Sequence, residues 1–269
     1  MKCQATERAD LATALEGLAE TDSLVDRLIE RVRPFLPLQP PARVLDVGAA
    51  QGATVTAFNR RGFEAIGVEP WKAAIEVSRQ VAAHTGIVTQ IVEGIAESLP
   101  FADGSFEFVN AYSVMEHVDD PRQAFKEAHR VLVPGGGFYF ATTSALSPRQ
   151  AEIAWFPMFP WYPDRTRRAI MKWATERHPA LVGHTTRPAY QWFKHREVRA
   201  GLREIGFAEV VDRWQLRREE SHGVRGAVVR ACSANRAIRL LGDIGLPGMD
   251  YLAIKAPATG PPARATRAC

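Results

Sequence analysis

The clearest chemical signal in the sequence is a glycine turn that follows a short apolar run. Residues 44–47 read VLDV, and the next five residues, GAAQG, place glycines at 48 and 52. Gly48 and Gly52 permit a tight turn and a close approach of the backbone to a ligand. A helix that starts after such a turn offers free N–H groups to an anionic ligand. This strand, turn and helix pattern indicates a site for a nucleotide-like ligand.

A carboxylate lies at a spacing that suits a ribose. Glu69 comes seventeen residues after Gly52 and precedes Pro70. A carboxylate there accepts hydrogen bonds from both hydroxyls of a cis-diol. The turn does not match G-x-G-x-x-G, because Ala50 occupies the second glycine position. A nucleotide-dependent oxidoreductase is therefore the less favoured alternative.

The elements that position these residues alternate between strand-like and helix-like segments. We predict strands at 43–47, 65–68, 88–92, 106–112, 138–142, 208–214 and 251–255, and helices at 54–61, 72–83, 122–132 and 198–205. Such alternation predicts an α/β fold, a Rossmann-like, doubly wound and mostly parallel sheet of seven strands. Ligands of these sheets bind at the carboxyl ends of the strands, where the strand order reverses.

Composition divides the chain into five parts. We predict an N-terminal helical segment at 1–41, with Thr21, Asp22 and Ser23 as caps of its second helix, and a cofactor-binding core at 42–144. A proline-rich and aromatic insertion follows at 145–193. Residues 194–256 complete the sheet and contain a second, irregular insertion near 217–248, and 257–269 form a flexible tail.

Six segments match a known family in order and spacing. They are 45–52 (LDVGAAQG), 68–70 (VEP), 96–101 (AESLPF), 103–109 (DGSFEFV), 115–118 (MEHV) and 130–136 (RVLVPGG). With these segments the sequence resembles the class I S-adenosylmethionine-dependent methyltransferases, in particular the type 11 small-molecule group that includes ubiquinone and menaquinone C-methyltransferases. The resemblance is strong over residues 43–143 and weaker over 195–214.

The resemblance implies S-adenosyl-L-methionine as the cofactor and a set of residues that hold it. Asp46, Gly48 and Gly52 would surround its methionine part, Glu69 its ribose, and Ala96 its adenine. The whole implied cofactor site is Asp46, Gly48, Ala49, Gly52, Glu69, Pro70, Ile95, Ala96, Glu97 and Tyr112.

Two positions depart from the family pattern. Ala50 stands where the family often has glycine, and a turn with φ below zero would accept its methyl group. Ile95 stands where the family often has an aspartate that binds the adenine amino group. These departures leave open a degenerate relative that binds the cofactor without turnover.

His117 is the candidate general base. It follows the predicted strand 106–112 at the edge where the methyl group would be presented. An imidazole with an ordinary pKa of about 6.5 can remove a proton from an acceptor hydroxyl or amine. A structural histidine at the sheet edge is an equally good interpretation.

The aromatic residues of the 145–193 insertion are candidates for the acceptor site. They could form an apolar wall or lid over the acceptor, or simply the private core of a helical cap. These candidates are Trp155, Phe156, Phe159, Trp161, Tyr162 and Trp192.

Charge is unevenly divided along the chain. Residues 1–143 hold 13 Lys and Arg against 19 Asp and Glu, and residues 144–269 hold 21 against 11. The basic half is compatible with an anionic acceptor, with peripheral contact with an anionic membrane surface, or with a solvated surface. Asn110 and the three residues after it lack the prolines typical of enzymes that methylate base amines, so no nucleic-acid partner is expected.

The remaining expectations concern compartment and chemistry. Cys3, Cys232 and Cys269 lack metal-ligand spacing, no clustered acidic ligand set predicts a metal, and no apolar run suggests secretion, so we expect a cytoplasmic protein. The predicted activity is methyl transfer to O, N or C of a small, partly apolar, anionic or neutral acceptor. The sequence gives no oligomeric state.

Overall fold

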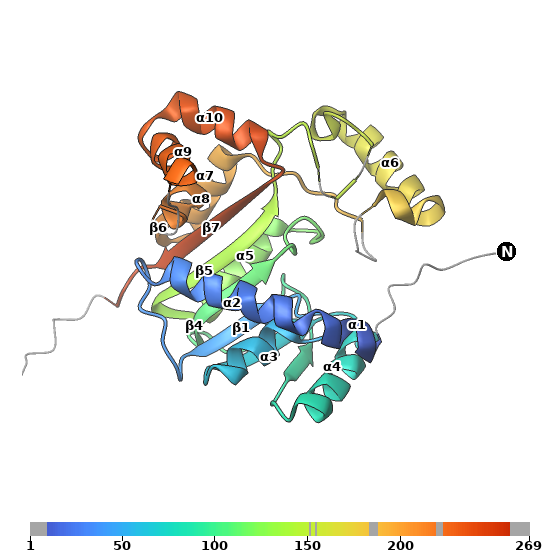
Figure 1. The fold of residues 1–269 in the computed structure, drawn as a ribbon, viewed down its shortest axis with the longest axis vertical. Coiled ribbons are helices and arrows are strands. Elements are labelled where there is room, and N and C mark those ends of the chain that lie inside the picture. The colour runs from blue at the N-terminus through green and yellow to red at the C-terminus, as the bar shows by residue number, and fades with distance from the viewer. Residues whose placement is uncertain (1–9, 151, 154, 183–187, 219–222, 259–269) are drawn as a thin grey trace, which may run out of the picture.

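A seven-stranded sheet forms the centre of the molecule (Figure 1). The computed structural model describes residues 10–150, 152–153, 155–182, 188–218 and 223–258. Across the sheet the strands are β3 (Gln90–Glu93), β2 (Glu64–Glu69), β1 (Arg43–Val47), β4 (Phe106–Tyr112), β5 (Leu132–Thr143), β7 (Gly248–Lys255) and β6 (Phe207–Asp212). Only β7 is antiparallel to its neighbours. The predicted doubly wound, mostly parallel sheet is confirmed.

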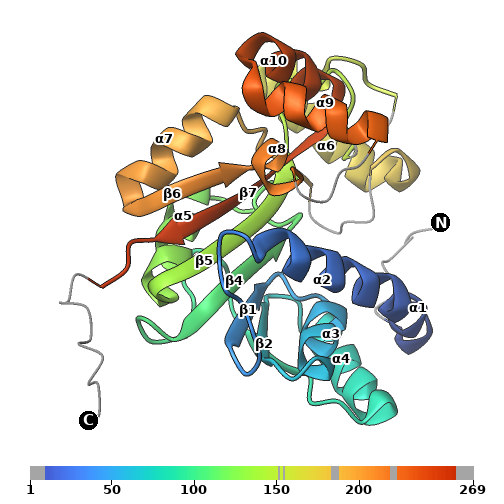
Figure 2. The same ribbon diagram turned by 60° about the vertical axis from the view of Figure 1, so that its left-hand side comes forward.

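Helices cover both faces of this sheet (Figure 2). One face carries α2 (Leu18–Val32), α3 (Ala53–Arg60) and α4 (Lys72–Thr85), and the other carries α5 (Pro121–Val131) and α7 (His195–Ile205). Successive residues of a strand point to opposite faces. Val44 therefore packs in the cluster under α2 and α3, and its neighbour Leu45 packs in the cluster that includes α5 and α7. Burial on both sides explains the nearly continuous apolar strands.

The helix α2 begins earlier than the sequence suggested. It follows α1 (Leu11–Glu16) almost directly, with Gly17 at its N-cap, so the predicted caps Thr21, Asp22 and Ser23 lie inside it. Its acidic side chains bind the neighbouring helix instead. Arg61, which follows α3, donates from Nη1 to Asp22 Oδ1 over 2.8 Å and from Nη2 to Asp26 Oδ2 over 2.8 Å. This clamp fixes α2 against α3.

The segment after β5 forms a small body with its own apolar core. It contains the 3-10 turns η1 (Phe159–Trp161) and η2 (Pro179–Leu181) on either side of α6 (Asp164–Arg177). Its buried residues are Ile153, Phe159, Met171, Ala174 and Ala189. The chain returns to the sheet at Phe193, whose carbonyl accepts a hydrogen bond from Ala145 N over 2.8 Å.

The segment between β6 and β7 is helical, and the prediction that 217–248 is irregular was wrong. After the short α8 (Arg213–Leu216), the described residues form α9 (Gly223–Ala234) and α10 (Arg236–Gly245). Asn235 separates the last two, and its side chain accepts a hydrogen bond from Ala237 N over 2.9 Å as the N-cap of α10. Short helices divided by a cap give no long periodic pattern, which explains the error. Of the predicted tail, residues 259–269 lie outside the described residues.

Within the described residues, no helix combines the length and the apolar character that crossing a bilayer requires.

The glycine turn after β1 also corrects an expectation. Gly48 has φ +72°, and a Cβ added there would lie 2.4 Å from Val114 Cγ2, so this position requires glycine. Ala50 has φ +45°, in the left-handed region, instead of the negative φ expected for it. Its N–H donates to Glu69 Oε2 over 2.9 Å, and this contact holds the turn in place. Ala50 is therefore a strained residue.

We expect Ala50→Gly to stabilise the protein by about 1 kcal/mol. Glycine removes a left-handed strain of roughly 1 to 2 kcal/mol and adds back about 0.5 to 1 kcal/mol of unfolded-chain entropy. The free energy of unfolding in urea measures the difference. Ala200→Gly, an exposed position inside α7, is the matched control and should cost about 1 kcal/mol. Equal losses in both variants would contradict the proposed strain.

Candidate active site

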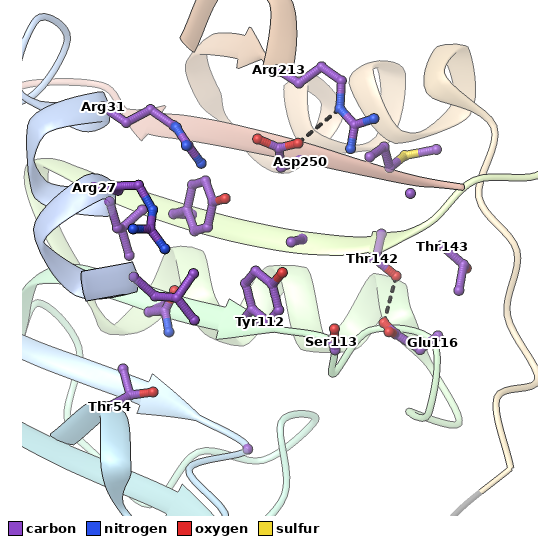
Figure 3. A pocket seen from close by; sticks show the side chains of 18 of the residues that line it. Arg27, Arg31, Thr54, Tyr112, Ser113, Glu116, Thr142, Thr143, Arg213 and Asp250 are labelled. Carbon is purple, nitrogen blue, oxygen red and sulfur yellow. Dashed lines mark hydrogen bonds and ion pairs between the residues drawn. The ribbon is translucent and has the colours of Figure 1, made fainter. Parts of the chain in front are cut away.

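A cavity of about 620 Å³ opens at the carboxyl edge of the sheet (Figure 3). It is bounded by the last residues of β1, β4 and β5 and by the first residues of β7. The antiparallel pairing Thr143↔Gly248 brings the start of β7 to this edge. The helix α2 closes one side, and α8 lies on another. Because β1 and β4 are neighbours where the strand order reverses, the cavity occupies the position where such sheets bind ligands.

The predicted cofactor residues divide into two groups. Asp46, Gly48 and Tyr112 line the cavity, together with Thr54 and Asn110. The others do not line the cavity. They lie in the glycine turn, at the end of β2 or shortly after β3: Ala49, Gly52, Glu69, Pro70, Ile95, Ala96 and Glu97. Tyr112 is 60% exposed, and Ile95 is 44% exposed. The two groups together trace a path from the cavity across the glycine turn toward β3.

Asp46 and Asn110 form a buried polar pair at the cavity floor. They lie opposite each other on β1 and β4, and Asn110 Nδ2 donates to Asp46 Oδ1 over 2.6 Å. Burial raises the pKa of Asp46 to about 7, although the bond from Asn110 acts in the opposite direction. Asn110 Oδ1 is buried and accepts no hydrogen bond from the described residues. A buried acceptor of this kind costs free energy unless a ligand supplies the donor.

Glu69 is oriented by two backbone amides. Its Oε2 accepts from Ala50 N over 2.9 Å, and its Oε1 accepts from Trp71 N over 3.0 Å. The carboxylate therefore joins the glycine turn to the start of α4. Each carboxylate oxygen has a second lone pair, so hydroxyl groups of a ligand can still donate to it.

Glu116 is the acidic residue that the sequence interpretation passed over. It lies in the turn after β4, is 1% exposed, and lines the cavity. Thr142 Oγ1 donates to its Oε2 over 2.7 Å. Burial raises the pKa of Glu116 to about 7, and the charge of Glu152, another lining residue, contributes a smaller increase. Its position directly before His117, shortly after the predicted strand 106–112, could have identified Glu116 from the sequence.

His117 lies in the same turn as Glu116. Its backbone N–H donates to Val114 O over 2.9 Å, and it is not among the residues that line the cavity. Its role as a base stays a prediction.

The six aromatic candidates of the insertion lie away from the cavity lining. Phe159 is fully buried in the core of the small body, and Phe156, Tyr162 and Trp192 pack against it. Trp155 and Trp161 are 87% and 54% exposed. Trp192 Nε1 donates to Gln150 Oε1 over 2.9 Å. This arrangement favours the private-core interpretation, and an acceptor contact by these residues stays a prediction.

Four arginines line the cavity instead. Arg213 Nε and Arg217 Nη2 lie 2.9 Å and 3.2 Å from Asp250 Oδ1, which is almost fully buried. Arg27 and Arg31 extend from α2 on the opposite side (Figure 3). The sequence interpretation missed all four, although the spacing of Arg27 and Arg31 places both on one face of a helix.

Comparison with known proteins identifies the core. Residues 45–140 match the model of the methyltransferase domain family. Over these residues the chain is similar to methyltransferase domains. The predicted resemblance is thereby confirmed over the part of the chain that carries the six motif segments.

Two curated relatives are methyltransferases by name. This chain is 40% identical over 97 residues to the uncharacterized methyltransferase YcgJ of Bacillus subtilis, and the aligned part is 36% of this chain and 38% of that protein. It is 30% identical over 145 residues to the ubiquinone biosynthesis O-methyltransferase of Pseudomonas aeruginosa, which is 46% of this chain and 61% of that protein. The chain thus spans about two fifths of the first relative.

Solved structures share the fold. The crystal structure of YcgJ superposes with a TM-score of 0.53 at 21% identity and covers 88% of this chain and 99% of that one. Phosphoethanolamine N-methyltransferase 2 of Haemonchus contortus, in complex with S-adenosyl-L-methionine, gives a TM-score of 0.53 at 15% identity and covers 85% of this chain and 52% of that one.

The two buried carboxyl groups make stability depend on pH. Because burial raises the pKa of Asp46 and Glu116, the folded protein binds their protons more tightly than the unfolded chain does. This contribution to stability is complete below the ordinary pKa values near 4, and it is lost as pH rises to about 7. The ligand-free protein should therefore lose stability between about pH 4 and about pH 7.

We expect Glu116→Gln to reduce the loss of unfolding free energy as the pH rises. Glutamine keeps an acceptor for Thr142 and cannot ionise, so the variant should gain about 3 kcal/mol relative to wild type between about pH 4 and about pH 7. Urea unfolding at each pH measures the change. Glu209→Gln, an exposed position on β6, should follow the wild-type profile. Parallel profiles for wild type and Glu116→Gln would show that Glu116 ionises normally.

Proposed function

We propose that the protein is an S-adenosyl-L-methionine-dependent methyltransferase whose acceptor is a small, partly apolar molecule bound in the cavity. The observation that carries this proposal is the cavity itself. At its floor lie Asp46 and Gly48, the two motif residues at the end of β1, and its volume suits a small molecule beside them. The match of residues 45–140 to methyltransferase domains supports the chemistry.

The residues present fit the cofactor. A Cβ at Gly48 would collide with Val114, so only glycine allows the tight turn that brings this backbone to the cavity. The buried Asn110 Oδ1 can accept a hydrogen bond from the amino group of a methionine part, and Asp46 offers a second acceptor beside it. Glu69 is oriented to receive ribose hydroxyls. When bound, the cofactor supplies a sulfonium methyl group as the electrophile.

The chain's own contribution to transfer is positioning and proton removal. Transfer forms a bond between the acceptor atom and the methyl carbon and breaks the carbon–sulfur bond, whose electron pair stays on sulfur. Alignment of the two reactants in a closed site lowers the barrier. If the acceptor atom carries a proton, a base must remove it, and a carboxyl group with a pKa near 7 suits this task at neutral pH. Glu116 has that property in the cavity, and His117 is the second candidate.

Binding of the cofactor is the first test. Wild-type protein titrated calorimetrically with S-adenosylhomocysteine should bind, and Glu69→Ala should weaken binding about tenfold, because lost hydrogen bonds to a carboxylate cost about 1.5 to 3 kcal/mol. Glu93→Ala is the matched control, since Glu93 ends the neighbouring strand and pairs only with Lys72 among the described residues. No binding by wild type, or tighter binding of NAD, would refute the proposal.

A turnover assay distinguishes an active methyltransferase from a degenerate relative that binds the cofactor without transferring a methyl group. A mass-shift screen of small metabolites with S-adenosyl-L-methionine should find an acceptor that gains a methyl group. Tight cofactor binding with no methylated product from any acceptor would favour the binding-only alternative that Ile95 and Ala50 suggest.

The two base candidates give different pH profiles with a proton-bearing acceptor. Glu116→Gln should lower kcat at least tenfold and remove the acidic limb of the kcat profile near pH 7, while affinity for S-adenosylhomocysteine stays unchanged. His117→Gln should leave that limb in place. The reverse result would assign the base to His117.

A further inference from the structure

We propose that Arg27 and Arg31 of α2 bind a carboxylate or phosphate group of the acceptor. The inference rests on the proposed function, because it concerns the acceptor side of the same cavity. It narrows the acceptor class to molecules that combine an apolar body with an anionic group.

The charges around the cavity are the first line of evidence. Asp250 forms ion pairs with Arg213 and Arg217, so these three side chains together keep one excess positive charge. Arg27 adds a further positive charge from the facing helix, where Arg31 also lines the cavity. The lining acids at the other end are Asp46, Glu116 and Glu152, and burial raises the pKa of each, which reduces their negative charge near neutral pH. The α2 side of the cavity is therefore strongly positive and favours an anion.

The distribution of charge on α2 is the second line of evidence. Its acids Asp22 and Asp26 bind Arg61 on the α3 side of the helix. Arg27 and Arg31 lie on the cavity side, four residues apart, where like charges repel by a few tenths of a kcal/mol. Within the part of the chain that the structure describes, Arg27 makes no ion pair with an acid. An anion beside Arg27 would supply the acidic partner that this side chain lacks among the described residues.

The surroundings of the arginines are the third line of evidence. The positive charge of Arg31 acts on the hydroxyl group of Tyr139, a lining residue of β5. The side chain of Arg31 extends from α2 at the wall of the cavity (Figure 3). Leu24 and Leu28 of α2 and Met249 of β7 supply apolar lining nearby. Guanidinium groups that are fixed beside apolar surface bind planar anions well, since each presents several donors in a rigid fork.

The test uses the protein saturated with S-adenosylhomocysteine and simple probes for the acceptor. Phenyl phosphate and benzoate carry the predicted anion on an apolar ring, and benzyl alcohol is their uncharged counterpart. Calorimetric titration should show that at least one anionic probe binds the complex at least tenfold more tightly than benzyl alcohol. Arg27→Gln should reduce that affinity about tenfold, and Arg27→Lys should retain part of it. Arg33→Gln is the matched control, because Arg33 is exposed at the end of α2 and does not line the cavity.

Three results would overturn the inference. The first is equal binding of charged and uncharged probes by the wild-type complex. The second is the same anion affinity in Arg27→Gln and Arg33→Gln. The third is a loss of S-adenosylhomocysteine affinity in Arg27→Gln with unchanged affinity for methylthioadenosine, which lacks the carboxylate, because the arginine would then serve the cofactor. Failure of wild type to bind S-adenosylhomocysteine at all would refute the proposed function instead.

Discussion

The change of direction in the strand order between β1 and β4 determines where this protein can bind a ligand. The connections on either side of that point run to opposite faces of the sheet, so no connecting helix covers the carboxyl ends of these two strands. The residues that line the cavity there are Gly48, Asp46 and Asn110. The rest of the site is built around this opening, with α2 on one side and the β7 edge on the other.

The two carboxyl groups buried at that opening affect both the stability of the protein and its capacity to exchange protons. Asp46 and Glu116 are placed where water is largely excluded, and each accepts a hydrogen bond from an uncharged side chain, Asn110 or Thr142. A neutral donor orients a carboxylate without neutralising it, so the groups stay close to their protonation midpoint at physiological pH. A charged partner would have stabilised the carboxylates and removed their capacity to exchange protons. The site thus keeps reactive groups at some cost in stability.

The sequence predicted the fold well because the evidence for it is local. The ends of β1 and β4 matched the structure, since apolar runs buried on both faces end at Gly48 and Ser113, where the backbone turns. The helices α9 and α10 were missed because their faces are short and a single residue, Asn235, both separates and caps them. The acceptor side was harder, because Arg27, Glu116 and Arg213 come from three distant segments. Nothing in their local patterns shows that they share a cavity, and the aromatic cluster at 155–162 gave a stronger apolar signal than any of them.

The antiparallel direction of β7 has a consequence for how the acceptor site can vary. β6 ends at Asp212 and β7 begins at Gly248, and both positions lie at the edge where the cavity opens. The chain between them leaves and re-enters the sheet at the cavity rim, and its two ends are held by Arg213 and Asp250 in one buried ion pair. Residues can be added or removed within this excursion without shifting the pairing of any strand. Proteins with the same sheet can therefore acquire different cavity walls by changing one connection, while Asp46, Gly48 and Asn110 remain where they are.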